Sequence, residues 1–276
     1  MQLPRALYFM GENDSQKFLK LLTGYYDKIY VVSIERTRKH RLEKLKENLK
    51  GLDYEFFEGV DATLLNDEEI NQIADLEKSR ETLNRFYQYR YGKQPNRTLR
   101  RSEIGCSYSH LKIYREMVEK GWKKVLVLED DARIDFSKIH LIPQMLNEIP
   151  VNAEVFYWGY RWYDCESASR RFFRLYISTP AKKMYALLSG TKYEDINERF
   201  PKPFKKHVWH SGLHAGTHGY AITLEGAKKV LAANFPITMN ADRAISYVRE
   251  QGNLKCYAAL PLIIRDDQTV PTSLNV

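Results

Sequence analysis

The stretch Lys124-Val125-Leu126-Val127-Leu128-Glu129-Asp130-Asp131 passes from a continuous apolar run directly into three carboxylates. A short run without alternating polar residues is typical of a strand buried on both faces, at the centre of a parallel sheet. Ligands of open parallel sheets bind at the carboxyl ends of the strands. The three acids therefore stand where a binding site is expected.

A strand–helix–strand unit precedes this stretch. Residues 28–34 predict a buried strand, residues 37–49 an amphipathic helix with Leu42, Leu45 and Leu49 on one face, and residues 54–57 a second strand. Two strands joined by a helix within so short a segment form a βαβ unit, which implies parallel pairing.

The rest of the chain continues this alternation. We expect helices over residues 102–120, 137–149, 225–233 and 242–251, and strands over residues 154–158, 219–222 and 254–260. Residues 1–25 are a lead-in with a helical patch at 16–22, and residues 160–206 form a long, basic insertion of weak periodicity. Because no linker or repeat divides the chain, we predict one α/β domain over residues 1–276 with a mostly parallel central sheet.

The composition limits the kinds of partner and the location that can be expected for this chain. The net charge is +8, which could serve nucleic acid, an anionic membrane surface or a phosphate-bearing substrate, or only solubility. No recognisable nucleic-acid module accompanies the charge, so we expect no nucleic-acid partner. No apolar run approaches the roughly 20 residues of a membrane span, and no signal peptide is visible. The three cysteines lie far apart and suit a reducing compartment, so a cytoplasmic location is expected.

The acids Glu129, Asp130 and Asp131 need a cation if they are buried, because an unpaired carboxylate is costly to remove from water. Oxygen ligands of this kind suit Mg²⁺ or Mn²⁺, which bridge to the phosphates of nucleotides. A solvated acidic turn is the alternative. The position after a buried strand favours the metal site.

Asp242 lies at the predicted start of a helix. The helix dipole alone would explain an aspartate there. The functional alternative is a general base that takes the proton from an acceptor hydroxyl as that hydroxyl attacks a sugar carbon.

Three other groups of residues each allow more than one interpretation. Cys106 and His110 are one helical turn apart, but no third group that would orient a thiol nucleophile is evident. Four histidines could line a helix and bind zinc, but glycines interrupt the segment, so a loop beside the substrate pocket is favoured. These histidines are His207, His210, His214 and His218. Four aromatic residues could stack on a sugar or a base, or belong to the rim of the core: Trp158, Tyr160, Trp162 and Tyr163.

Four motifs in order resemble glycosyltransferase family 25, over about residues 28–275. They are Val31-Val32-Ser33-Ile34-Glu35-Arg36 with Arg41, Ser102-Glu103-Ile104-Gly105-Cys106 with Ser109-His110, Val127-Leu128-Glu129-Asp130-Asp131, and Gly216-Thr217-His218-Gly219-Tyr220-Ala221-Ile222-Thr223 followed by Gly226-Ala227.

The resemblance implies a GT-A type, Rossmann-like domain that binds a nucleotide sugar. It implies Mn²⁺ (or Mg²⁺) on Asp131 and Glu129, and inverting transfer of a hexose, usually galactose from UDP-galactose, to give a β-linkage. Asp242 aligns with an aspartate of the family and is the expected base. The residues expected to contact the donor are Ser33, Glu35, Arg36, Arg41, Glu103, Ser109, His110, Glu129, Asp130 and Gly219.

The expected acceptor is a surface glycan such as lipooligosaccharide, which can be lipid-linked. The insertion 160–206 would shape its site, and the positive charge would allow peripheral contact with the inner face of a membrane.

Two alternatives remain. A nucleotidyltransferase typically has a Gly-rich first loop with a lysine, whereas residues 35–38 contain no glycine. The other is a non-catalytic carbohydrate-binding module.

Overall fold

The computed structural model describes residues 12–91, 94–161, 168–189, 201–212, 214–267 and 269. Its strands are β1 Lys28–Ser33, β2 Glu55–Glu58, β3 Lys124–Glu129, β4 Ala132–Ile134, β5 Val155–Arg161, β6 Lys202–Pro203, β7 Val208–His210, β8 Ala215–Thr223, β9 Cys256–Ala259 and β10 Ile264–Asp266. Eight of them form one sheet in the order β2-β1-β3-β8-β5-β9-β7-β6, and β10 pairs with β4. The predicted α/β class is confirmed.

The large sheet is mixed rather than mostly parallel. β1 runs parallel to β2 and β3, and β5 runs parallel to β9. β8, in contrast, is antiparallel to both of its neighbours, β3 and β5, and β7 is antiparallel to β9 and β6. Apolar patterning reports burial and not strand direction, so the sequence did not reveal the reversal. As a result, the first residues of β8 lie beside the acidic end of β3.

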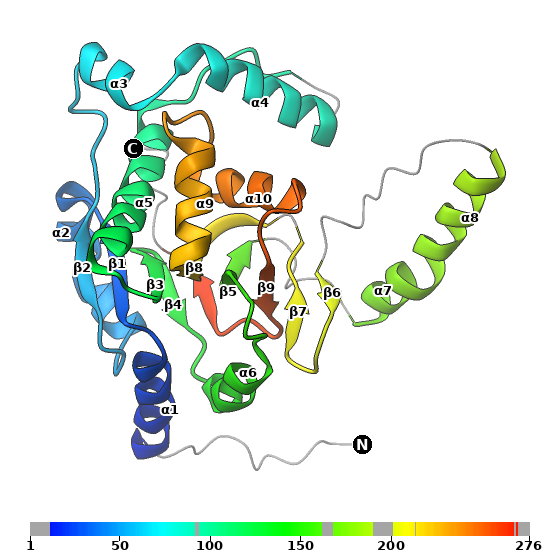
Figure 1. The fold of residues 1–276 in the computed structure, drawn as a ribbon. Helices are drawn as coiled ribbons and strands as arrows, with labels where there is room; N and C mark the ends of the chain where they lie inside the picture. Colours follow the sequence, from blue (N-terminus) through cyan, green and yellow to red (C-terminus); the bar gives the residue numbers. More distant parts are fainter. Residues whose placement is uncertain are drawn as a thin grey trace.

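Helices cover both faces of this sheet (Figure 1). They are α1 Glu12–Tyr25, α2 Glu35–Asn48, α3 Asp67–Ile73, α4 Leu76–Tyr91, α5 Arg101–Lys120, α6 Ile142–Glu148, α7 Ala168–Phe173, α8 Thr179–Ser189, α9 Leu224–Asn234 and α10 Ala241–Glu250, with a 3₁₀ turn η1 at Ile139–Leu141 and a π turn η2 at Arg174–Ser178. One core contains residues of α1, α2 and α6, and the other contains residues of α5, α9 and α10.

Strand β3 joins the two cores. Val125 and Val127 pack into one of them, Leu126 and Leu128 into the other, and all four side chains are fully buried. A strand covered on both faces needs apolar residues at every position, which explains its uninterrupted run. The central position predicted for this stretch is therefore confirmed.

Two helix ends have a clear local cause. The Thr223 side chain accepts a hydrogen bond from the Gly226 amide at 3.2 Å and caps α9. Gly121 ends α5 in the left-handed conformation, with φ of 68°. The lead-in contains more structure than its helical patch, because α1 buries Leu19 and Leu22 in the core.

Other elements differ from expectation. The helix expected over 137–149 divides into η1 and α6, with Pro143 in the first turn of α6. Within the insertion, α7, η2 and α8 extend away from the layered body (Figure 1). None of the helices in the described part of the chain has the length and apolarity that a bilayer span requires.

Gly105 tests the packing of α5. A Cβ at this position would meet the Val60 carbonyl oxygen and lie 3.0 Å from the Ala62 amide nitrogen. We therefore expect Gly105→Ala to lower the free energy of unfolding by about 1–3 kcal/mol, because backbone atoms must shift.

Gly24→Ala is the matched control for this measurement, since Gly24 is also helical and a Cβ there would have nothing within 4 Å. It should leave stability unchanged or raise it by up to about 1 kcal/mol. Equal effects of the two variants in urea unfolding would contradict the packing.

Candidate active site

A cavity of about 280 Å³ opens at the carboxyl ends of β1 and β3. Its lining includes every predicted site residue except Glu35 and Gly219. The lining residues come from β1, the start of α2, the loop after β2, the first half of α5, the end of β3, the start of β8 and the start of α10. Segments far apart in the sequence thus form one site.

The two exceptions lie elsewhere. Glu35 is exposed and pairs with Lys39 at 3.1 Å. Gly219 lies within β8, where a Cβ would approach the Ile264 side chain to 2.8 Å. Its small size therefore serves the contact between β8 and β10, and the structure does not bring it to the cavity.

Asp130 is enclosed by three donors. Its carboxylate accepts hydrogen bonds from Ser33 Oγ at 2.9 Å and Thr37 Oγ1 at 3.0 Å, and it forms an ion pair with Arg41. The side chains of Asp130 and Arg41 are about nine-tenths buried. This group fastens the end of β1 and the start of α2 to the end of β3, so the wall of the cavity is held in place.

The start of β8 contacts three other carboxylates in succession. The Gly216 amide donates to Asp242 Oδ2 at 3.0 Å, and Thr217 Oγ1 donates to Glu129. His218 Nδ1 lies 3.2 Å from Asp131 Oδ1. Of these β8 residues, sequence reasoning had singled out only His218, as part of the histidine cluster. Their place at the head of the fourth motif was the available signal.

Backbone geometry explains two of these positions. Gly216 has φ of 81°, a conformation that side-chain-bearing residues rarely adopt. Asp242 lies in the first turn of α10, where the helix dipole favours a negative charge. The carboxylate of Asp242 is thereby fixed at the edge of the cavity.

Burial and charge alter the protonation of the acidic cluster. Burial raises the pKa of Glu129 to about 7, against the opposing effect of His218. Burial by itself lowers the pKa of His218, but the hydrogen bond to Asp131 and the charge of Glu129 outweigh it, and that pKa rises to about 9. The site thus stabilises positive charge between Glu129 and Asp131.

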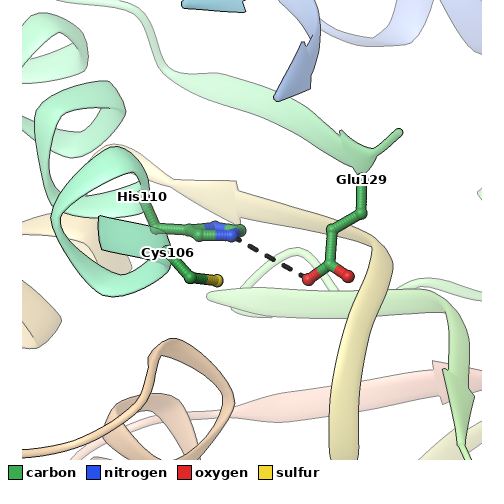
Figure 2. A group of neighbouring side chains, drawn as sticks. All are labelled: Cys106, His110 and Glu129. Atoms are coloured by element: carbon green, nitrogen blue, oxygen red, sulfur yellow. Dashed lines mark ion pairs between the residues drawn. The ribbon is translucent and has the colours of Figure 1, made fainter. Parts of the chain in front are cut away.

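His110 approaches the same cluster from α5 (Figure 2). Its Nδ1 lies 2.7 Å from the Tyr220 hydroxyl, and its Nε2 lies 4.0 Å from Glu129 Oε1. Nε2 has no hydrogen-bond partner among the described residues. Burial lowers the pKa of His110 to about 4, so the ring is neutral near pH 7.

Cys106 lies one turn before His110, and Figure 2 shows its sulfur near the same carboxylate. Burial, together with the negative charges of Glu129 and Asp242, raises the pKa of Cys106 well above its usual range. A nucleophilic cysteine needs the opposite shift. The environment therefore disfavours the thiolate that a nucleophile would require.

Alkylation tests this environment. The rate at which iodoacetamide modifies Cys106 should still rise with pH above the usual thiol pKa of about 8.5, because the thiolate forms late. Peptide mapping by mass spectrometry separates Cys106 from the other two cysteines, with glutathione as the reference thiol. A rate that levels off at or below the glutathione pKa would contradict the raised value.

Glu103 and Ser109 hold the rim of the cavity. The Glu103 carboxylate accepts hydrogen bonds from the two terminal guanidinium nitrogens of Arg97, at 2.7 and 2.9 Å, and from the Arg100 amide at 2.7 Å. Although burial raises the pKa of Glu103, the hydrogen bonds from Arg97 lower it below its usual range. Ser109 Oγ accepts from the Val60 amide at 2.8 Å. Both side chains are occupied by the protein and shape the cavity.

The other histidines and aromatic residues that the structure describes do not line the cavity. His214 stacks on Tyr160 with ring centroids 3.8 Å apart, and both are buried. Trp158 is fully buried and donates to the Tyr26 hydroxyl at 2.7 Å. His210 ends β7 and His207 precedes it, and strands β5 and β9 separate β7 from β8, which contains His218. Trp162 and Tyr163 fall outside the described residues.

The residues fit a divalent metal. Glu129, Asp131 and His218 each offer a ligand atom, and these atoms lie within 4.8 Å of one another. The buried His218 Nε2 also has no hydrogen-bond partner among the described residues. Carboxylates suit Mg²⁺ or Mn²⁺ and an imidazole suits transition metals, so this set of ligands suits a divalent cation. His218 is therefore a third candidate ligand beside Glu129 and Asp131, the two that the sequence predicts.

The sequence profile of glycosyltransferase family 25, described as an LPS biosynthesis protein, matches residues 26–245. The chain therefore belongs to glycosyltransferase family 25.

Among its relatives, human procollagen galactosyltransferase 2 is 24% identical over 259 residues, covering 87% of this chain and 35% of that protein. A glycosyltransferase 25 family member of Anopheles gambiae is 29% identical over 209 residues, covering 74% of this chain and 28% of that protein. The human inactive glycosyltransferase 25 family member 3 is 30% identical over 136 residues, covering 48% of this chain and 21% of that protein. The chain thus spans about a third or less of the length of these relatives.

Among solved structures, apo mouse xyloside xylosyltransferase 1 is similar over 94% of both chains, at 12% identity and a TM-score of 0.36. A score this low does not by itself establish a shared fold.

Replacement of Arg41 tests whether its ion pair with Asp130 stabilises the wall of the cavity. Arg41→Met should lower the free energy of unfolding by about 3–5 kcal/mol, because it leaves the buried Asp130 without its counter-charge. Adding Asp130→Asn should recover part of the loss. Lys39→Met, on the exposed face of α2, should change stability by no more than about 0.5 kcal/mol. Equal effects of Arg41→Met and Lys39→Met in urea unfolding would contradict the role of the ion pair.

Proposed function

We propose that this chain is a metal-dependent, inverting glycosyltransferase that moves a hexose, galactose from UDP-galactose, onto a hydroxyl of a saccharide acceptor. Membership of the family supports transfer of a sugar, and the relative named procollagen galactosyltransferase 2 supports galactose. The observation that carries the proposal is the gathering of Glu129, Asp131 and Asp242 around one cavity by the first residues of β8.

The charge of the cavity supports the metal. Its lining contains six carboxylates, of which Asp61, Glu103 and Asp130 are paired with arginines, and the other three would repel an anionic diphosphate without a cation between. The six are Asp61, Glu103, Glu129, Asp130, Asp131 and Asp242. Glu129, Asp131 and His218 would hold Mn²⁺, which when bound neutralises charge on the leaving diphosphate.

Asp242 is the proposed base. Its carboxylate lines the cavity, and the Gly216 amide and the start of α10 hold its orientation. One Asp242 oxygen accepts that amide, and a carboxylate has a second oxygen with which to take a proton from an acceptor hydroxyl. An inverting transfer is a single in-line displacement, so it needs one such base on the acceptor side.

Arg36 is the proposed cation for the donor phosphates. It lines the cavity, and its side chain is about half exposed, with Nε 3.2 Å from Asp61 Oδ2. An arginine in this position can turn toward a phosphate and bind it through two nitrogens. Ser33, Arg41 and Asp130 would act through the shape of the wall.

The proposed acceptor is a surface glycan such as lipooligosaccharide, reached from the cytoplasmic side of a membrane. The family description as an LPS biosynthesis protein supports this choice. The insertion 160–206 would contribute to the acceptor site.

Release of nucleoside diphosphate tests the function. The chain is incubated with a panel of nucleotide sugars and Mn²⁺, and then with EDTA. We expect UDP release from UDP-galactose that EDTA abolishes. Asp131→Asn and Asp242→Asn should each reduce the rate on the order of 10²–10³-fold. Asp53→Asn, an exposed aspartate outside the cavity, is the matched control and should leave the rate unchanged.

Release from another sugar would overturn the donor and leave the mechanism in place. If no nucleotide sugar is hydrolysed and no nucleotide raises the melting temperature with Mn²⁺ present, the proposal is contradicted and a non-catalytic binding protein is favoured. The name of the human inactive family member 3 makes this outcome a specific alternative.

A further inference from the structure

The segment from Ala168 to Ser189, which we call the arm, differs in charge from the rest of the chain. It contains five cationic residues and no aspartate or glutamate. The cationic residues are Arg170, Arg171, Arg174, Lys182 and Lys183. The arm therefore accounts for +5 of a net charge of +8, within 22 residues.

The arm also exposes large apolar side chains. Those in α7 and η2 are 49–60% exposed, and those in α8 are 58–80% exposed. They are Phe172, Phe173, Tyr176 and Ile177 in the first half, and Met184, Tyr185, Leu187 and Leu188 in the second. Scattered single residues of this kind are normal on a surface, whereas eight in one short segment indicate an interaction site.

Their spacing gathers them on helix faces. Phe172 and Tyr176 are four residues apart, and their rings are in contact with centroids 5.0 Å apart. Met184 and Leu188 are also four residues apart, and Leu187 lies three residues after Met184. Positions with these separations are neighbours on a helix surface. Each half of the arm thus presents an apolar stripe.

No described element of the body covers these stripes. Figure 1 shows α7 and α8 extending away from the layered body, whereas α9 lies on the sheet. The exposed fractions of apolar side chains in the two helices differ accordingly. Ala227 and Val230 of α9 are at most 1% exposed, whereas Leu187 and Leu188 of α8 are 77% and 80% exposed.

We propose that the arm docks on the surface of an anionic lipid bilayer, with its apolar stripes in the headgroup–acyl boundary and its cations among anionic headgroups. A helical segment with an apolar face and many Lys and Arg residues is the type that lies in this interface. Acidic lipids attract such cations, and the arm itself contains no aspartate or glutamate that anionic headgroups would repel. Docking would bring the cavity to a lipid-linked acceptor, and only this consequence rests on the proposed function.

The charge pattern discriminates against other occupants. Nucleic acid would use the five cations but would leave eight apolar side chains in water. A second copy that paired through the same face would bring two sets of five cations together, which is unfavourable. An anionic bilayer satisfies both the charge and the apolar surface.

Vesicle sedimentation with the full chain is the test. Vesicles of phosphatidylcholine are compared with vesicles that also contain phosphatidylglycerol, at low and high salt. We expect the bound fraction to yield at least about a tenfold higher affinity for the anionic vesicles. Lys182→Gln/Lys183→Gln should reduce this preference and its salt dependence, and Leu187→Gln/Leu188→Gln should weaken binding to anionic vesicles at both salt concentrations.

The matched control is Leu64→Gln/Val151→Gln, which removes two exposed apolar side chains outside the arm and should leave binding unchanged. Asp131→Asn should bind vesicles like the unaltered chain, so failure of the transferase proposal and failure of docking are distinguishable. Equal binding to neutral and anionic vesicles, no binding, or equal effects of the arm and control variants would overturn the proposal. Self-association that Leu187→Gln/Leu188→Gln abolishes, without lipid binding, would assign the face to a second copy instead.

Discussion

The buried ion pair between Asp130 and Arg41, with the hydroxyls of Ser33 and Thr37, is the interaction on which the site depends. It satisfies the middle carboxylate of three consecutive acids from within the protein. A buried charge of this kind is tolerated only when it is paired and hydrogen-bonded. Once Asp130 is held toward α2, its neighbours Glu129 and Asp131 contact β8 on the other side. One carboxylate thus secures the fold, and the other two face the cavity.

The reversed direction of β8 is the second constraint. An antiparallel strand places its first residues beside the last residues of its neighbour. Gly216, Thr217 and His218 consequently face the end of β3 and the start of α10 together. A parallel strand in the same position would have placed its final residues there instead. The topology therefore determines which side chains meet the carboxylates.

Much of the fold was predictable from local patterns. The apolar run of β3 predicts a buried strand, which is confirmed, and the cap at Thr223 and the stop at Gly121 also have local physical causes. The direction of β8 was not predictable, because residues buried on both faces look the same in either orientation. Gly219 was expected to contact the donor because of the family resemblance, whereas the close approach of Ile264 explains its small size.

The candidate site was likewise only partly predictable from the sequence. The acids and Asp242 were recognisable by their positions at strand and helix ends, and the structure brings them into one cavity. The hydrogen bond of Thr217 and the contact of His218 join residues about 90 positions apart, so no local pattern could reveal them. The roles of Glu103 and Ser109 in shaping the rim depend on tertiary contacts in the same way.

In the proposed site, Glu129 and Asp131 hold a divalent metal for a bound nucleotide. Electron paramagnetic resonance of free Mn²⁺, titrated into the chain with and without UDP, tests it most directly. We expect UDP to strengthen Mn²⁺ binding to the unaltered chain and to Asp53→Asn, and we expect Asp131→Asn to lose this binding while remaining folded. Equal Mn²⁺ binding by Asp131→Asn and the unaltered chain, or no binding by either with UDP present, would contradict it.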